Sequence, residues 1–203
     1  MHTDLFADFR QPEQNLLPVD GIVQDYGFIF PEDQADVYFQ SLYCHTPWQH
    51  DEVVMAGQRI QTQRQIAWYA DASQNYVYSG VSHASLPWTA LLLDIKTAIQ
   101  DQLHTHFNAC LLNLYHDGQE GLAWHSDNEP IWGKQPTIAS LSLGASRRFV
   151  FKHKITQQKY ELTLHHGQLL VMRGQTQNHW LHSLPKMAKV DQPRINLTFR
   201  YYL

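Results

Sequence analysis

Apolar residues follow helical spacing most clearly in the segment just before position 104. They recur mainly at steps of three and four residues, so they lie on one face of a helix. Ser85-Leu-Pro87 offers a capping side chain and a proline suited to a first turn, so we predict that this helix begins there. The predicted buried stripe is Leu91, Leu92, Ile95, Ile99 and Leu103.

Upstream of that helix the pattern changes several times. The first twenty residues are polar with scattered Leu and Phe, which predicts an irregular arm, and residues 21–29 predict a short strand. Pro31 opens a predicted helix to about Tyr43, with acids in the first turn where the helix dipole favours them. Residues 52–80 alternate polar positions with Val, Ile, Tyr and Trp, which predicts hairpin strands.

After Phe107 the pattern becomes that of short strands separated by glycines. Many short strands with turn residues between them favour a β-sandwich or jelly roll with helices packed outside. The predicted fold is therefore α+β and mainly β, in one domain spanning residues 1–203 with its core in 107–203. The predicted strands are 109–115, 138–143, 148–153, 160–164, 168–173 and 194–201.

The last predicted strand has two contrasting faces. Because side chains alternate along a strand, one face carries Arg194, Asn196, Thr198 and Arg200, and the other is apolar. The apolar face suits a core, so the polar face points either at solvent or into a polar cavity. In a cavity, the two arginines could clamp a short dicarboxylate. The alternative is an exposed sheet face with ordinary arginines.

The strand at 109–115 repeats this division. Asn113 and Tyr115 share one face, while Leu112 and Leu114 share the other. An amide and a phenol can both donate hydrogen bonds to carboxylate oxygens. The alternative is a tyrosine that only fills the core.

Composition narrows the class of protein. The chain has 203 residues, 43% of them hydrophobic and 17% charged, which suits a packed core and excludes a disordered chain. No apolar run is long enough to cross a bilayer, and no secretory signal opens the chain. Only Cys44 and Cys110 are present, too few for a disulfide framework, so we expect free thiols and a cytoplasmic protein.

The formal net charge of −4 argues against a protein that coats nucleic acid non-specifically. A local basic rim remains compatible with it. The interpretation favoured by composition is that the clustered cations are ordinary solvated charges. These cations are Arg147, Arg148, Lys152, Lys154, Lys186 and Lys189, with Arg59 and Arg64 further upstream.

His125 and Asp127 are the first candidates for a metal site. A His-x-Asp pair places two ligating groups on one side of an extended segment, and a further histidine would complete a set of two histidines and one carboxylate. That set leaves coordination positions open for substrate and oxygen, as in non-haem Fe(II) oxygenases. With 13 histidines in the chain, the pair alone is a weak signal. Residue types alone leave four candidates for the third ligand: His165, His166, His179 and His182.

Five ordered motifs together resemble the AlkB nucleic-acid dealkylases, and the resemblance extends over about residues 50–202. The motifs are Asn-Leu-Tyr-x-Asp-Gly (113–118), Trp-His-Ser-Asp-Asn-Glu-Pro (124–130), Ile-Ala-Ser-Leu-Ser-Leu-Gly-Ala-Ser-Arg (138–147), His-Trp-Leu-His-Ser-Leu-Pro (179–185) and Pro-Arg-Ile-Asn-Leu-Thr-Phe-Arg (193–200). The resemblance implies an Fe(II)- and 2-oxoglutarate-dependent dioxygenase with a double-stranded β-helix, or jelly roll, fold.

The resemblance also assigns roles. It implies that His125, Asp127 and His182 bind iron, since the family's third ligand directly precedes a Ser-Leu-Pro-like segment. The implied residues for 2-oxoglutarate are Arg194, Arg200, Asn113, Tyr115, and Asn196 or Thr198.

The segment at about residues 50–80 resembles the family's nucleotide-recognition lid. Flat aromatic residues suit a base that has been flipped out of its stack. The implied base contacts are Tyr76, Tyr78 and Ser79, with Trp68 or Tyr69 stacking on the base or closing the pocket, and Asn128 and Glu129 approaching the base. Some of these aromatics could instead serve hairpin packing, and Asn128 departs from the acid common in relatives.

The implied reaction is oxidative demethylation of N-alkylated bases such as 1-methyladenine and 3-methylcytosine. The expected partner is alkylated DNA, with RNA as an alternative, and O2 is consumed while 2-oxoglutarate becomes succinate and CO2. We expect a monomer that binds no membrane. Met55 stands where duplex-invading relatives carry an aromatic or bulky wedge, which favours single strands or a mixed preference.

Three alternatives differ in what they require. A 2-oxoglutarate oxygenase acting on a protein or a small molecule keeps the iron and co-substrate residues but needs no basic groove. A catalytically silent nucleic-acid-binding module predicts a broken ligand set. A structural metal-binding β-domain has no use for two inward arginines.

Overall fold

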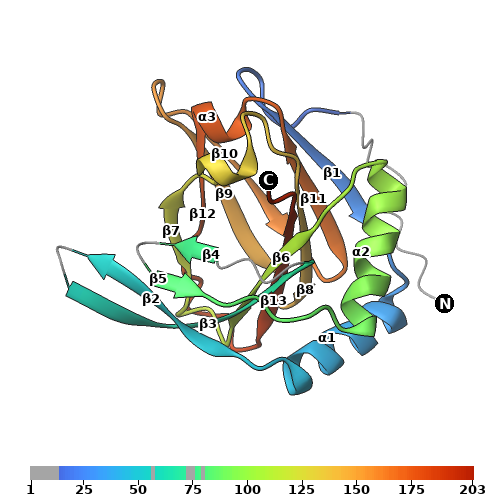
Figure 1. Cartoon of the computed structure of the whole chain (residues 1–203). Helices are drawn as coiled ribbons and strands as arrows, with labels where there is room; N and C mark the ends of the chain where they lie inside the picture. The colour runs from blue at the N-terminus through green and yellow to red at the C-terminus, as the bar shows by residue number, and fades with distance from the viewer. Residues whose placement is uncertain (1–13, 56–57, 72–75, 79–80) are drawn as a thin grey trace.

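Two antiparallel sheets face each other in a jelly roll, as the strand pattern predicted (Figure 1). The computed structural model describes residues 14–55, 58–71, 76–78 and 81–203. The larger sheet, in spatial order, is β1 (Ile22–Phe28), β11 (Gln168–Arg173), β8 (Ile138–Gly144), β13 (Arg194–Arg200), β6 (Ala109–Tyr115), β3 (Gln58–Ala70) and β2 (Gln49–Met55). The smaller sheet is β10 (Lys159–Leu164), β9 (Arg147–His153), β12 (Trp180–Leu184) and β7 (Leu122–His125). A separate two-stranded ladder joins β4 (Tyr76–Tyr78) and β5 (Val81–His83).

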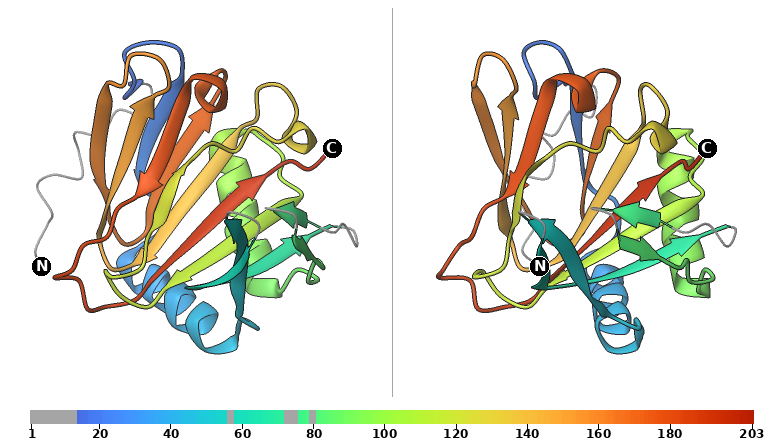
Figure 2. Two further views of the ribbon diagram at one scale, coloured as in Figure 1. Left: turned by 90° about the vertical axis from the view of Figure 1, so that its left-hand side faces the viewer. Right: turned by 60° about the vertical axis from the view of Figure 1, so that its left-hand side comes forward.

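Helices α1 (Glu32–His45) and α2 (Ala90–Leu103) cover one face of the larger sheet, and the smaller sheet covers the other (Figure 2). The main core lies between these helices and the apolar faces of the central strands. Ile195, Leu197 and Phe199 of β13 are fully buried there. A second core, containing Phe151, Trp180 and further apolar residues, fills one end of the space between the two sheets.

Helix α2 keeps the predicted stripe but begins later than predicted. Its cap is Thr89, whose hydroxyl accepts a hydrogen bond from the backbone N–H of Leu92 at 3.2 Å. The expected start at Ser85 is wrong because that segment is extended. The N–H of Leu86 donates to the carbonyl of Trp68 at 2.8 Å, so the backbone there pairs with β3 and does not coil.

Most predicted strands are confirmed to within one or two residues, but β2 begins at Gln49, three residues before the predicted hairpin segment. β5 lies just after that segment, and β7 and β12 were not predicted either. β7 and β12 are four and five residues long, and their pairing is irregular between His182 and Leu184. Such short, bulged strands carry too little alternation to be recognised from sequence. A one-turn helix, α3 (Thr176–His179), and a 3-10 turn (Pro130–Trp132) were also not predicted.

Cys44 and Cys110 are free thiols, as expected. Among the described residues, no helix is both long and apolar enough to span a membrane.

Arg147 corrects the expectation of solvated charges, because its side chain is fully buried. Its guanidinium donates to the carbonyl oxygens of Asp117 at 3.0 Å, Glu120 at 2.6 Å and Pro185 at 3.0 Å. Three carbonyls around one cation satisfy most of its donors. Arg147 therefore joins the loop before β7 to the loop after β12, the two strands that carry His125 and His182.

Those two loops also meet backbone to backbone at Gly118. A Cβ at this position would lie 1.8 Å from the carbonyl oxygen of Met187, inside the contact distance of any real atom pair. We therefore predict that Gly118→Ala lowers the free energy of unfolding by about 3 kcal/mol, the upper end for overpacked sites. Urea denaturation, followed by tryptophan fluorescence, measures the free energy of unfolding.

Gly174→Ala serves as the control for that prediction. Gly174 has a φ of +59° but its nearest neighbour atom would be 3.5 Å from the new Cβ, so only the backbone cost of about 1 kcal/mol applies. Equal losses in the two variants would contradict the close approach of the loops.

Candidate metal centre and pocket

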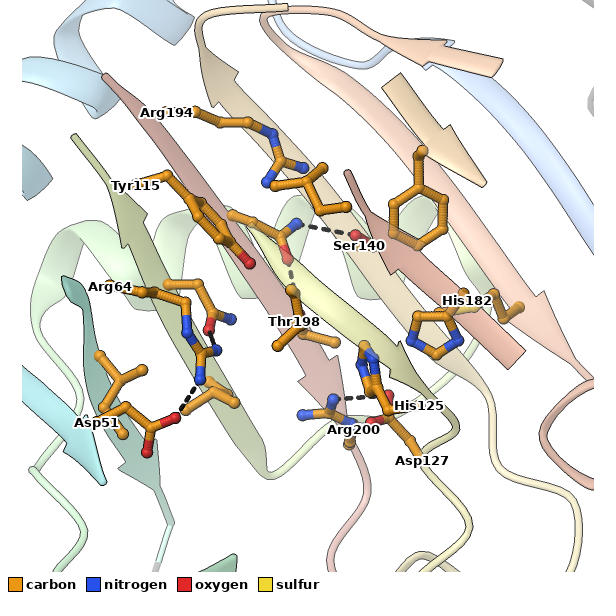
Figure 3. Close-up of a pocket in the computed structure, with 18 residues that line it drawn as sticks. Asp51, Arg64, Tyr115, His125, Asp127, Ser140, His182, Arg194, Thr198 and Arg200 are labelled. Carbon is orange, nitrogen blue, oxygen red and sulfur yellow. Dashed lines mark hydrogen bonds and ion pairs between the residues drawn. The ribbon is translucent and has the colours of Figure 1, made fainter. Parts of the chain in front are cut away.

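One pocket between the two sheets collects the polar faces of the central strands (Figure 3). The alternation predicted for the last strand is confirmed: its four polar side chains line this pocket, while its apolar side chains enter the core. Asn113 and Tyr115 of β6 line the same pocket, as predicted. The other lining residues are Asp51, Arg64, Ile66, Leu111, Leu122, His125, Asp127, Ser140, Phe149, Met172, His182 and Leu184.

His125, Asp127 and His182 come together at the smaller sheet. The register of β7 and β12 places His182 directly opposite His125, and the two ring centroids are 4.1 Å apart. Ligand atoms of all three residues lie within 4.8 Å of one another. Of the four third-ligand candidates, His182 is the one that completes this group. His125 ends β7, and Asp127 lies in the loop that follows and not on the strand itself.

The protonation of the two histidines suits metal binding. Nδ1 of His125 lies 2.9 Å from the carbonyl oxygen of Ala123, which only accepts, so Nδ1 carries the proton and Nε2 keeps its lone pair. Burial, together with neighbouring His125, lowers the pKa of His182 from 6.5 to about 3. The His182 ring is therefore neutral near pH 7 and has a lone pair to donate.

Asp127 is held as a carboxylate by an ion pair. Its burial alone would raise its pKa, but Arg200 and the two histidines hold the pKa of Asp127 well below its usual range. Arg200 donates to Oδ2 of Asp127 at 2.7 Å, and both side chains are buried. The N–H of Asp127 donates to Oε1 of Gln177 on α3 at 2.9 Å. The loop is thus fixed from two sides.

Asp20, His153 and His179 form a second group with potential ligand atoms within 4.8 Å of one another. The hydrogen bonds of His153, however, do not suit metal binding. Nδ1 of His153 accepts from the backbone N–H of Thr156 at 3.1 Å. The proton of a neutral ring must then sit on Nε2, which faces the Asp20 carboxylate at 3.3 Å. His153 has no lone pair left for a metal, so we assign the metal to the His125 group.

Arg194 is the pocket's second electrostatic feature. Burial lowers its pKa to about 10, so it remains charged near neutral pH. Its guanidinium donates to the hydroxyl of Ser142 at 2.9 Å and lies 5.6 Å from the centre of the Tyr115 ring. Within the described part of the chain, no carboxylate forms an ion pair with it. A buried cation of this kind is stabilised by an anionic ligand.

The two predicted co-substrate arginines therefore have different surroundings. Arg200 belongs to the metal end through Asp127, whereas Arg194 faces the opposite end of the pocket (Figure 3). Between them, Asn196 donates to Ser140 and to the carbonyl of Leu141, and accepts from Thr198. Asn196 and Thr198 thus line the pocket with most of their hydrogen bonds already made.

The structure separates the predicted base contacts. Trp68 is buried on the inner face of β3 and packs against Trp132, while Tyr69 points the other way into the main core and does not reach the pocket. Glu129 accepts a hydrogen bond from Trp132 at 2.8 Å. Asn128 is exposed outside the pocket. Ser79 and the side chains of Tyr76, Tyr78 and Met55 lie outside the described part of the chain.

Asp51 and Arg64 were not predicted as pocket residues, and Arg64 was expected to be solvated. Both are buried in the pocket wall and form an ion pair. The alternation of Arg64, Ile66 and Trp68 along β3 was the signal that could have placed Arg64 inward.

A jelly roll that holds two histidines and a carboxylate between its sheets is the arrangement of a mononuclear non-haem iron oxygenase. The sequence comparisons agree with that class: residues 25–200 match the family described as the 2OG-Fe(II) oxygenase superfamily. DNA oxidative demethylase ALKBH2 of Mus musculus is 33% identical, over 97% of this chain and 87% of its own length.

Alpha-ketoglutarate-dependent dioxygenase alkB homolog 3 of Bos taurus is 37% identical over 82% of this chain. The aligned region spans 61% of that relative, less than two thirds of its length. Two solved structures share the fold. OsALKBH1 has a TM-score of 0.59 and 17% identity, and the match covers 91% of this chain and 99% of that chain. An oxidoreductase of the 2OG-Fe(II) oxygenase family from Burkholderia pseudomallei has a TM-score of 0.59 and 15% identity, and the match covers 96% of this chain and 93% of that chain. The chain therefore belongs to the AlkB-type 2OG-Fe(II) oxygenases.

The residues present fit the family's Fe(II) and 2-oxoglutarate. The donor set combines two imidazoles with one carboxylate, and Nδ1 of buried His182 has no hydrogen-bond partner among the described residues. Arg194 offers a buried positive charge for a carboxylate of the co-substrate.

We predict that Arg200→Met lowers the affinity for Mn(II), used as a stable substitute for Fe(II), by about tenfold, because an orienting partner of a ligand is removed. His182→Ala should abolish binding at this site. Isothermal titration calorimetry measures both. His153→Gln is the matched control and should leave the Mn(II) affinity unchanged, and an unchanged affinity in Arg200→Met would refute the orienting role.

Proposed function

We propose that this protein removes N-methyl groups from alkylated bases in DNA by oxidation. The observation that carries the proposal is the complete His125, Asp127, His182 set beside the buried Arg194, in a chain 33% identical to a DNA oxidative demethylase over almost its whole length. The 1-methyladenine and 3-methylcytosine lesions are the proposed substrates. We also propose that the protein acts as a monomer, since a single chain supplies the complete ligand set and the buried Arg194.

The proposed co-substrate site is the Arg194 end of the pocket. The Arg194 guanidinium would bind the distal carboxylate of 2-oxoglutarate, with Tyr115 and Asn113 as further donors. The bound metal, with 2-oxoglutarate and O2, supplies oxidation of the N-methyl carbon, yielding succinate, CO2 and a hydroxymethyl group that leaves the base as formaldehyde. His125, Asp127 and His182 would hold the metal. Arg200 keeps Asp127 ionised and in place.

Apolar side chains in the pocket wall exclude water from the site. Phe149 and Leu184 line the pocket from the smaller sheet, and Met172, Ile66 and Leu111 line it from β11, β3 and β6 of the larger sheet. Such walls limit the access of water to a reactive centre. The base would enter between β7 and β2, an edge strand of each sheet, since residues from both strands line the pocket.

An exposed aromatic residue beside this opening supports a nucleic-acid partner. Trp124, immediately before His125, is 38% exposed. The Nζ atoms of Lys152 and Lys159 lie 4.7 Å and 6.0 Å from the centre of its ring. A ring that can stack on a base, next to two ammonium groups that can bind phosphates, suits a single strand leaving the pocket. A protein or small-molecule substrate would have no need of this combination.

The direct test is turnover of an oligonucleotide that carries one 3-methylcytosine. With Fe(II), ascorbate and 2-oxoglutarate, the protein should release the methyl group as formaldehyde. Mass spectrometry of the oligonucleotide detects the loss of the methyl group from the base. His182→Ala should reduce the rate by more than about a hundredfold, because a ligand is lost. Failure to demethylate matched single- and double-stranded DNA and RNA, despite normal iron binding, would exclude the proposal.

The surface at Trp124 gives a second prediction. For single strands, each phosphate contact contributes about 0.7 to the slope of log K against log salt concentration. We expect the Lys152→Gln, Lys159→Gln double variant to lower the magnitude of that slope by about 1.4. Trp124→Ala should weaken binding by about 1–3 kcal/mol at every salt concentration without changing the slope.

Fluorescence anisotropy with a labelled single strand measures both effects. Arg173→Gln is the matched control, because Arg173 lies on β11 and contacts Tyr26 of β1 at the other edge of the larger sheet. A change of slope of about 0.7 in that control, half that of the double variant, would mean that the effect reports total charge and not this surface.

A further inference from the structure

A buried ion pair links the β2–β3 hairpin to the pocket. Asp51 of β2 is 1% exposed, Arg64 of β3 is 6% exposed, and both side chains line the pocket wall. The guanidinium of Arg64 donates to Oδ2 of Asp51. Neither residue belongs to the metal group or to the proposed site for the distal carboxylate.

Arg64 has a second partner on the neighbouring strand. Its Nη1 donates to Oδ1 of Asn113 on β6, and Figure 3 draws both interactions of Arg64 as dashed lines. Arginine carries donors only, so the Asn113 amide must present its oxygen to Arg64. The amide nitrogen, Nδ2, is then turned away from Arg64. It has no hydrogen-bond acceptor in the described part of the chain.

Hairpin stability alone does not explain this arrangement. Burying two charges costs desolvation, and a packed apolar pair of similar volume often serves stability equally well. The hairpin already has apolar inward residues at Ile66 and Trp68. An ion pair that is hydrogen-bonded to the Asn113 amide fixes the orientation of that amide, which an apolar pair cannot do.

We infer that Asp51 and Arg64 are positioning residues that hold the Asn113 amide with its N–H groups toward 2-oxoglutarate. This inference rests on the proposed function, because it takes 2-oxoglutarate as the ligand of the pocket. Asp51 fixes the guanidinium, the guanidinium fixes the amide oxygen, and the amide nitrogen donates to a co-substrate oxygen. The hairpin that borders the base opening and the co-substrate site are thereby joined through three side chains.

The test measures binding of 2-oxoglutarate to the Mn(II)-loaded protein without oxygen, by calorimetry. The first variant is the double change Asp51→Leu, Arg64→Met, which replaces both charges of this ion pair by apolar groups. Its Kd for 2-oxoglutarate should rise about tenfold, while its Kd for Mn(II) stays unchanged. An unchanged Kd for 2-oxoglutarate would overturn the inference.

A double-mutant cycle then separates positioning from direct contact. Asn113→Ala should raise the Kd for 2-oxoglutarate by a similar factor. If Asp51 and Arg64 act through Asn113, adding their double change to Asn113→Ala causes no further loss. An additive loss would mean that Arg64 binds the co-substrate itself, and would also overturn the inference.

Asp71→Asn is the matched control. Asp71 pairs with the buried Lys96 of α2 at 3.0 Å, outside the pocket, so its loss should leave the Kd for 2-oxoglutarate unchanged. If 2-oxoglutarate is not the ligand of this pocket, the result is different: the wild-type protein, loaded with Mn(II), would not bind 2-oxoglutarate at all. Failure of the proposed function at the level of the DNA substrate is read separately, in the oligonucleotide assay.

Discussion

Strand alternation in the larger sheet is the constraint on which the rest of the structure depends. Each central strand has to bury an apolar face beneath α1 and α2 while its other face builds a polar pocket. A shift of one residue in the register of β13 would send Arg194 and Arg200 into the main core and Ile195 into the pocket. The same pairing that stabilises the sheet therefore also fixes which groups can meet a ligand.

Several charged side chains are buried in this protein, and each is stabilised in a different way. Asp127 and Arg200 neutralise each other beside the histidines. Arg147 is surrounded by backbone carbonyls from two loops. Arg194 has a hydroxyl and an aromatic ring near it but no carboxylate among the described residues. That difference distinguishes a cation that supports the structure from one that suits an anionic ligand.

The parts of this molecule that can be predicted from the sequence are those in which apolar residues recur at the spacing of a strand or a helix. The two faces of β13, the two faces of β6 and the buried stripe of α2 follow directly from spacing, and the structure agrees with them. The two short strands that carry or support histidine ligands do not follow from spacing, because four or five residues with a bulge show no period.

The partners of buried charges are equally hidden from sequence reasoning. Arg64 and Arg147 resemble surface cations until the fold surrounds them, since their partners lie 13 to 49 and 27 to 38 residues away along the chain. His182 was chosen as a ligand through a family motif, and the register of β7 and β12 gives the physical reason for that choice. Asp127 lies in a loop whose position depends on Gln177 and Arg200, which no local pattern could indicate.

The metal group also has a consequence for how the chain reaches its native state. His125 and His182 lie on strands that are separated by β8 to β11 in sequence and meet only when the smaller sheet has assembled. Contacts between such distant segments form slowly, because their loop-closure entropy must be overcome first. An unfolded chain therefore presents no preformed site, and a bound ion selects the closed jelly roll with a free energy that grows with the logarithm of its concentration. Metal supply then contributes to the free energy of unfolding of the protein, as well as to its activity.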